Sequence, residues 1–179
     1  MSRRSRGREV ALQLLYEREH NARMDRAALE QFARERIRDE SIREFCLLLF
    51  DGVVAQVADI DAKIAAAAEN WRVSRMTTVD RNILRLGAFE LLFMRDTPAA
   101  VVFDEAIELA RRYGSGDSSA FVNGVLDRLG QESGVGRQEA VVMGPESGVG
   151  SQESGVSSQE SVVNGVDSEC NRDGANANH

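Results

Sequence analysis

The stretch SIREFCLLLFDGVVAQVADIDAKI at residues 41–64 carries an apolar residue at every third or fourth position. At 3.6 residues per turn, this spacing places the apolar residues in one stripe along one side of a helix of about seven turns. A helix with such a stripe buries it against other helices of a small core. The residues of the stripe are Ile42, Phe45, Cys46, Leu49, Val53, Val57, Ile60 and Ile64.

The same helical period continues on both sides of this stretch. Towards the amino terminus, helices are expected at about residues 6–20 and 26–37. Towards the carboxyl terminus, Thr77 and Asp80 have the spacing of a capping box, and the apolar residues that follow them predict another helix. No segment of the first 130 residues has the alternating pattern of a β-strand.

Two further helices are expected before residue 131. One has Thr97 as its N-cap and ends at Gly114. The last begins near Asp117 or Ser118 and stops at Gly130, where the helical period ends. We therefore predict an all-α domain of at least six helices over residues 1–130.

The junction near residues 71–77 separates the helical pattern into two halves. This division suggests two small helical bundles that share an interface, at about residues 1–72 and 75–130.

Residues 131–179 form a different region. The units QESGVGR, QEAVVMG, PESGVGS, QESGVSS and QESVVNG repeat every seven residues from residue 131 to residue 165. Each unit offers few apolar side chains among Gly and Ser, which is too little burial to offset the entropy of ordering the chain. We therefore predict a disordered, acidic, low-complexity tail rather than a coiled coil.

The charge of the chain is uneven. The protein has 179 residues, a formal net charge of −7 and a pI near 5.0, yet four of its first eight residues are Arg3, Arg4, Arg6 and Arg8. Cations at a helix N-terminus oppose the helix dipole, so these arginines are better explained by an external anion such as phosphate. The alternative is a frayed terminus that only aids solubility.

Several functional classes lack support in the sequence. No stretch is long and apolar enough for a membrane helix or a signal sequence, so we expect a cytoplasmic protein. Cys46 is expected in the core and Cys170 in the tail, and two histidines offer little for a metal site. Catalytic motifs are missing, and YGSGDSS at residues 113–119 is better explained by a helix end and a helix start than by a nucleotide loop. We expect a binding protein without catalytic activity, metal or cofactor.

Three stretches together are similar to one known family. RGREVALQLLY near the start, VDRNILRLGAFELL from residue 79 and DEAIELARRYGSGDSSAFVNGVLD from residue 104 resemble the bacterial transcription antitermination factors of the NusB family. The resemblance runs from about Arg3 to Leu129 in the family's order and spacing, and FVNGVLD is its most specific part.

The resemblance implies both a fold and a function. The fold would be two three-helix bundles, and the function would be binding of the boxA element of nascent ribosomal RNA together with NusE, a protein of the small ribosomal subunit. This assembly would help the RNA polymerase elongation complex to resist termination. The protein would act as a monomer or as a homodimer.

The resemblance also implies an RNA-binding surface. An aromatic ring at a helix start can stack on a base, and free N–H groups there can hold a phosphate. Two of the expected residues have alternative explanations, because Phe121 could belong to the core and Arg85 could pair with a nearby acid. The expected RNA-binding residues are Arg3, Arg4, Arg6, Arg8, Arg85, Asp117, Ser118 and Phe121.

For the protein partner, the resemblance points to Tyr16 and Asp80, with His20 at the border of the same surface. Tyr16 suits an interface anchor, although a half-buried core tyrosine would have the same pattern. Asp80 is also the acid of its own capping box.

Two other functions remain to be compared with this one. A ribosomal RNA methyltransferase family carries a related domain at its amino terminus, but nothing after Gly130 could form the methyl-donor domain. The other alternative is a helical interaction module that has kept the NusE surface and lost RNA binding.

Overall fold

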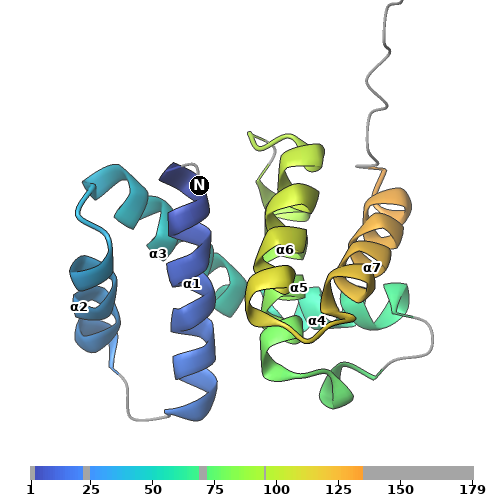
Figure 1. The fold of residues 1–179 in the computed structure, drawn as a ribbon, viewed down its shortest axis with the longest axis horizontal. Coiled ribbons are helices and arrows are strands. Elements are labelled where there is room, and N and C mark those ends of the chain that lie inside the picture. Colours follow the sequence, from blue (N-terminus) through green and yellow to red (C-terminus); the bar gives the residue numbers. More distant parts are fainter. Residues whose placement is uncertain (1–2, 22–24, 69–71, 95, 135–179) are drawn as a thin grey trace, which may run out of the picture. The chain divides into compact units, whose positions relative to one another are not determined.

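The structure is a computed structural model that describes residues 3–21, 25–68, 72–94 and 96–134. This part of the chain is helical and contains no strand, which confirms the predicted all-α class (Figure 1). The predicted disordered tail lies almost entirely outside the described residues. The elements are α1 (Arg3–His20), α2 (Arg26–Arg36), α3 (Glu40–Ala55), α4 (Val57–Ala67), the short 3₁₀ helix η1 (Val73–Arg75), α5 (Thr78–Phe93), α6 (Ala99–Tyr113) and α7 (Ser118–Glu132).

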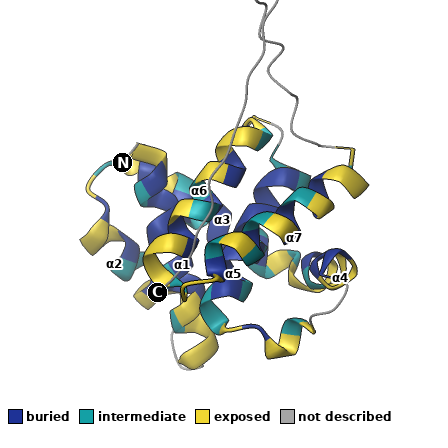
Figure 2. Ribbon diagram, turned by 45° about the vertical axis from the view of Figure 1, so that its right-hand side comes forward, coloured by how far each residue is buried: buried dark blue, intermediate teal, exposed yellow. Residues whose placement is uncertain are grey.

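The helices form two groups that meet at α5. Helices α1, α2 and α3 pack together, and α5, α6 and α7 pack together, while α1 and α3 also contact α5. Much of helix α5 is buried (Figure 2). Ile83, Leu84 and Ala88 on this helix are 0% exposed. None of the described helices is both long and apolar enough to cross a membrane.

The prediction of one long helix over residues 41–64 is wrong, because the chain bends at Gln56. The backbone there has φ −108° and ψ 14°, which ends α3 and starts α4. Helix α3 packs against α1 and α5, whereas α4 packs against α5 and α7. The bend therefore lets one continuous apolar stripe serve both groups of helices, and α4 joins the helices that follow the predicted junction.

The ends of the helices agree in part with the sequence. The Asp80 N–H donates to Thr77 Oγ1 at 3.1 Å, which confirms Thr77 as the N-cap of α5, and the Thr77 hydroxyl, rather than its backbone N–H, donates to Asp80 Oδ2 at 2.8 Å. The predicted cap at Thr97 is wrong, because Pro98 occupies the N-cap of α6. Gly130 was expected to end the last helix but is buried within α7, which continues beyond it.

A glycine sets the distance between α3 and α5. A Cβ atom on Gly52 would lie 2.0 Å from Phe89 Cζ and 2.4 Å from Phe89 Cε2. No real side chain tolerates such contacts, so the Phe89 ring fits only because residue 52 has no side chain. This close approach helps to hold the two groups of helices together.

Candidate functional site

The arginine run forms the first two turns of α1, so the alternative of a frayed terminus is wrong for residues 3–8. Arg3 has a side chain that is 84% exposed and pairs with Asp39 at 3.2 Å. Arg4 is exposed, with its guanidinium carbon 5.3 Å from the centroid of the Phe45 ring. These charges lie at the surface, where an external anion can reach them.

Arg6 is also accessible, although a neighbour on its own helix already binds it. Its Nη1 lies 2.7 Å from Glu9 Oε2, and its side chain is 42% exposed. The Glu9 carboxylate is buried, but the Arg6 guanidinium is exposed on its other side, where an external anion can reach it. Arg3, Arg4 and Arg6 are called the outer arginines below.

Arg8 requires a correction, because it is not a surface residue. It is 2% exposed, and it donates from Nε to Glu90 Oε1 at 2.8 Å and from Nη2 to Glu90 Oε2 at 2.6 Å. Glu90 on α5 is equally buried, and Glu105 on α6 lies 3.8 Å from Arg8 Nη1. Such a two-pronged, charge-assisted pair fixes geometry, so Arg8 holds α1 against α5 and α6 and is not available to RNA.

Two more polar contacts join α1 to α6. Ser5 Oγ donates to Glu105 Oε1 at 2.5 Å, and the Tyr113 hydroxyl donates to Glu9 Oε1. Burial alone would raise the pKa of Glu9, but hydrogen bonds from Tyr113 and Arg6 outweigh it and hold that pKa below its ordinary value. Burial and the Glu9 carboxylate raise the pKa of Tyr113. The ionised Glu9 carboxylate therefore accepts hydrogen bonds from both Arg6 and Tyr113.

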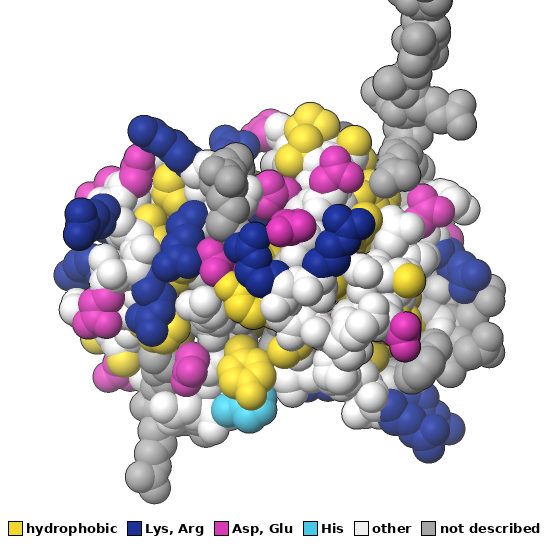
Figure 3. All heavy atoms as spheres, viewed as in Figure 1, with side chains coloured by type: hydrophobic (Ala, Val, Ile, Leu, Met, Phe, Trp, Pro, Cys, Tyr) yellow, Lys and Arg dark blue, Asp and Glu magenta, His cyan; other side chains and the backbone are white. Residues whose placement is uncertain are grey.

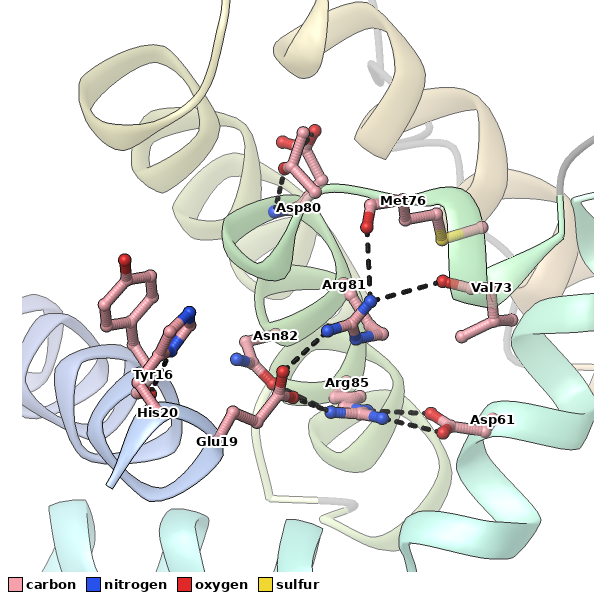
Figure 4. A network of polar contacts seen from close by, with 11 residues as sticks. Tyr16, Glu19, His20, Asp61, Val73, Met76, Asp80, Arg81, Asn82 and Arg85 are labelled. Atoms are coloured by element: carbon pink, nitrogen blue, oxygen red, sulfur yellow. Dashed lines mark hydrogen bonds and ion pairs between the residues drawn. The ribbon is translucent and has the colours of Figure 1, made fainter. Parts of the chain in front are cut away.

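Arg85 also differs from its expected role in RNA binding. It donates from Nε to Asp61 Oδ1 at 2.8 Å and from Nη2 to Asp61 Oδ2 at 2.7 Å, and it also binds Glu19 (Figure 4). Its side chain is only 13% exposed. Burial would lower its pKa, but Asp61 and Glu19 outweigh burial and raise it. The alternative explanation, pairing with a nearby acid, is confirmed.

Glu19, Asp61 and Arg81 complete this network, and no pattern in the sequence marked them. Arg81 donates to Glu19 Oε2 at 2.6 Å and to the Met76 carbonyl at 3.2 Å (Figure 4). Burial would raise the pKa of Glu19, but Arg81 and Arg85 lower it overall. The network ties the end of α1 to α4, α5 and the segment around η1, so its charges serve the fold.

Of the three residues at the start of α7 that were expected to bind RNA, Asp117 and Phe121 have accessible side chains and Ser118 does not. Ser118 is 2% exposed; its Oγ accepts from the Ser115 N–H at 2.8 Å, and its own N–H donates to the Ser115 carbonyl at 3.1 Å. The structure therefore excludes Ser118 as a free donor. Asp117 is exposed, while Phe121 is half-buried and packs against the core. A Cβ on Gly114, the C-cap of α6, would lie 2.4 Å from Ser118 Cβ, so glycine permits this turn.

The residues that were expected to bind the protein partner also differ in exposure. Tyr16 is 40% exposed and stacks on His20, with ring centroids 4.1 Å apart. His20 Nδ1 lies 2.9 Å from the Tyr16 carbonyl oxygen, which can only accept, so Nδ1 carries the proton. Asp80 is 6% exposed and is held by Thr77, so its position corrects the expectation of a surface contact.

The part of the chain that the structure describes offers no metal site. No group of three or more His, Cys, Asp and Glu side chains there could hold a metal ion. Cys46 is buried as predicted, and burial raises the pKa of its thiol to about 12.

Basic and acidic side chains are mixed over α1, α2 and α6 on the face seen in Figure 3. This mixed surface is accessible to a large charged ligand.

Comparisons with known proteins agree along nearly the whole helical domain. Residues 5–131 match the model of the NusB family. The transcription antitermination protein NusB of Sorangium cellulosum is 46% identical over 134 residues, covering 75% of this chain and 96% of that protein. The corresponding protein of Trichlorobacter lovleyi is 44% identical over 129 residues, covering 72% and 91%.

Solved structures give the same result. The structure of T. maritima NusB matches with a TM-score of 0.65 and 38% identity, over 74% of this chain and 92% of that one. A crystal structure of the antitermination factors NusB and NusE in complex with dsRNA matches with a TM-score of 0.67 and 27% identity, over 74% and 98%.

Proposed function

This chain belongs to the NusB family, and we propose that it is a non-catalytic transcription antitermination factor. It binds boxA-type RNA of nascent ribosomal RNA transcripts together with NusE, and this assembly supports processive transcription by RNA polymerase. The observation that carries the proposal is the match, over 98% of its length, to a NusB chain that was solved with NusE and RNA. Action on nascent transcripts requires a cytoplasmic protein in bacteria.

The RNA-binding surface that we propose is smaller than the one expected from the sequence. It consists of the outer arginines of α1, with Asp117 and Phe121 at the start of α7. Arginines confer affinity by neutralising phosphates, which makes binding dependent on salt and largely independent of sequence. Base selectivity then depends on stacking and on contacts to base edges.

The protein partner is assigned to the surface at the end of α1. Tyr16 and His20 form an exposed aromatic stack there. A tyrosine of this kind buries a large apolar area and keeps a polar end in contact with water, which suits the centre of an interface.

Fluorescence anisotropy with a labelled boxA-type RNA and a scrambled RNA, with and without NusE, tests this function. The variant Arg3→Ala with Arg4→Ala and Arg6→Ala removes the outer arginines. Its control removes three exposed arginines elsewhere, by Arg34→Ala, Arg38→Ala and Arg72→Ala. We expect the first variant to bind RNA more weakly and with less salt dependence than the control.

The opposite result has a defined meaning. Suppose that the folded wild-type protein binds NusE but binds neither the boxA-type RNA nor the scrambled RNA, whether NusE is present or absent. The proposed RNA-binding function is then wrong. The chain would then act as a helical interaction module that has lost RNA binding.

A further inference from the structure

The Phe45 ring on α3 lies against the arginine-rich start of α1. Helices α1 and α3 pack side by side (Figure 1), and a Cβ atom on Gly7 would lie 2.8 Å from Phe45 Cδ1. The glycine therefore lets the ring approach the backbone of α1. Arg4 and Arg8 each have their guanidinium carbon 5.3 Å from the centroid of this ring. The function proposed above gives the ring no role.

The fold holds this ring in place before any ligand binds. Phe45 is half-buried and packs against the core. The buried Arg8, which pairs with Glu90 at 2.6 Å, lies beside it. A guanidinium over an aromatic ring is attracted by the negative face of the ring. Phe45 therefore offers a fixed surface to the exposed Arg4 guanidinium.

Arg4 differs from the other two outer arginines in the contacts of its guanidinium. Arg3 and Arg6 each pair with a carboxylate, at 3.2 Å and 2.7 Å, so some of their N–H groups already have an acceptor. Among the residues that the structure describes, no carboxylate forms an ion pair with Arg4, which contacts the Phe45 ring instead. Stacking occupies the face of a guanidinium and leaves the N–H groups at its edge free to donate to a phosphate.

We propose that Phe45 is a positioning residue of the RNA-binding surface, and that Arg4, which it orients, is the strongest phosphate contact among the outer arginines. This inference rests on the function proposed above. An exposed arginine side chain loses rotamer freedom when it binds a ligand, and a ring that holds its guanidinium beforehand lowers that cost. Unlike Arg3 and Arg6, Arg4 has no carboxylate to give up when a phosphate binds.

The first test is a double-mutant cycle between Phe45 and Arg4. Anisotropy measures the affinity for a boxA-type RNA across a salt series, with and without NusE. Phe45→Leu removes the ring and keeps an apolar side chain, Arg4→Ala removes the cation, and a third protein carries both changes. Phe45→Tyr keeps the ring. Phe32→Leu is the matched control, because the Phe32 ring lies under another guanidinium, that of Arg36, at 3.4 Å.

We expect Phe45→Leu to weaken RNA binding by roughly 3-fold to 10-fold, the range for one side chain that must be ordered on binding. The salt slope should not change, because Arg4 keeps its charge. In the Arg4→Ala protein the same change should have an effect below about twofold, since no guanidinium remains to be oriented. Phe45→Tyr and Phe32→Leu should bind RNA within about twofold of the wild type, because both leave a ring beside Arg4.

A second test uses exposed residues and does not depend on the packing of Phe45. Arg4→Lys keeps the charge but loses the planar guanidinium. Arg3→Lys makes the same change at a residue that pairs with Asp39. We expect Arg4→Lys to lose about 3-fold more RNA affinity than Arg3→Lys. Thermal unfolding verifies that each variant folds, and this second comparison decides if Phe45→Leu does not.

Four results would overturn the inference. If the wild type binds RNA and folded Phe45→Leu binds it equally well, Phe45 orients nothing while the proposed function stands. If Phe45→Leu weakens binding by the same factor with and without Arg4, the ring does not act through Arg4. Equal losses in Arg4→Lys and Arg3→Lys would remove the special role of Arg4. If the wild type does not bind RNA, with or without NusE, the proposed function and this inference both fail.

Discussion

Arg4 and Arg8 lie one turn apart on α1, and both guanidinium carbons are 5.3 Å from the same Phe45 ring. Arg4 is exposed to solvent, whereas Arg8 is enclosed with Glu90 and Glu105. The side of α1 that faces α5 and α6 thus uses its charges to hold helices together. The outer side leaves the same residue type exposed to solvent, so one arginine-rich run contains both a buried structural arginine and accessible arginines.

The largest expected effect comes from the buried side. Arg8→Ala leaves the Glu90 carboxylate buried without its cation, and we expect it to lower the free energy of unfolding by about 3–5 kcal/mol. Urea denaturation followed by circular dichroism measures this loss. The double variant Arg8→Met with Glu90→Leu removes both charges, and it should recover most of the stability. If Arg8→Ala is as stable as the wild type, the buried side does not hold α1.

A smaller effect is expected where α3 meets α5 beside α1. Gly52→Ala places a methyl group against the buried Phe89 ring, so the ring or the helices would have to shift. We expect a loss of about 1–3 kcal/mol, as for other overpacked cores, from the same urea measurement. Gly124→Ala is the control, since a Cβ there meets nothing within 4 Å. Equal stability of the two variants would contradict the close packing of α3 on α5.

Glu9 lies between the two sides, and its contribution should depend on pH. Its pKa is lower in the folded state than in the unfolded state, so the unfolded state binds more protons and stability falls as pH falls. The stabilisation is complete above the ordinary glutamate pKa of about 4.3 and disappears as pH drops through the folded value.

Glu9→Gln should therefore cost about 1 kcal/mol at pH 7, the usual net value of a hydrogen bond. The difference from the wild type should shrink below about pH 4, in thermal unfolding curves recorded from about pH 7 to about pH 3. A difference that is constant over this range would show that the Glu9 charge has no part in stability.

The smallest stability effect is expected on the outer side. Replacing Arg3, Arg4 and Arg6 by alanine removes exposed charges and one partner of the buried Glu9, which keeps its hydrogen bond from Tyr113. The unfolding free energy should therefore fall by less than about 1 kcal/mol. Urea denaturation of this variant beside Arg8→Ala gives the comparison. A loss as large as that of Arg8→Ala would mean that the outer arginines are also structural.

The helices were predictable because their signal is local. The apolar spacing and the Thr77 capping box depend on residues a few positions apart, and they placed α1, α2, α5, α6 and α7 to within a few residues. The bend at Gln56 was not predictable, since glutamine is a good helix former with no breaking signal. The bend lets α4 pack against α5 and α7, which are distant in sequence.

The sequence indicated which residue types form the candidate site, but it did not show which of these side chains are exposed and which are buried in ion pairs. Arg8 and Glu90 are 82 residues apart, and Arg85 and Asp61 are 24 apart, so no local pattern shows that these charges meet. Ser118 is a different case, because its partner Ser115 is close in sequence, but the residue types alone did not show that the turn between them buries Ser118. The roles proposed for the outer arginines, Asp117, Phe121, Tyr16 and His20 remain predictions.

The most direct test measures RNA affinity and stability on the same two proteins. One carries Arg3→Ala, Arg4→Ala and Arg6→Ala, and the other carries Arg8→Met with Glu90→Leu. The division of α1 into two sides predicts that the triple arginine variant keeps its stability and loses RNA affinity. The slope of its RNA affinity against salt should be lower by about 0.7 for each phosphate that is no longer neutralised. The Arg8→Met, Glu90→Leu variant should keep the salt slope of the wild type. An equal decrease of RNA affinity and of salt slope in both proteins would contradict the division of the arginine run between ligand and fold.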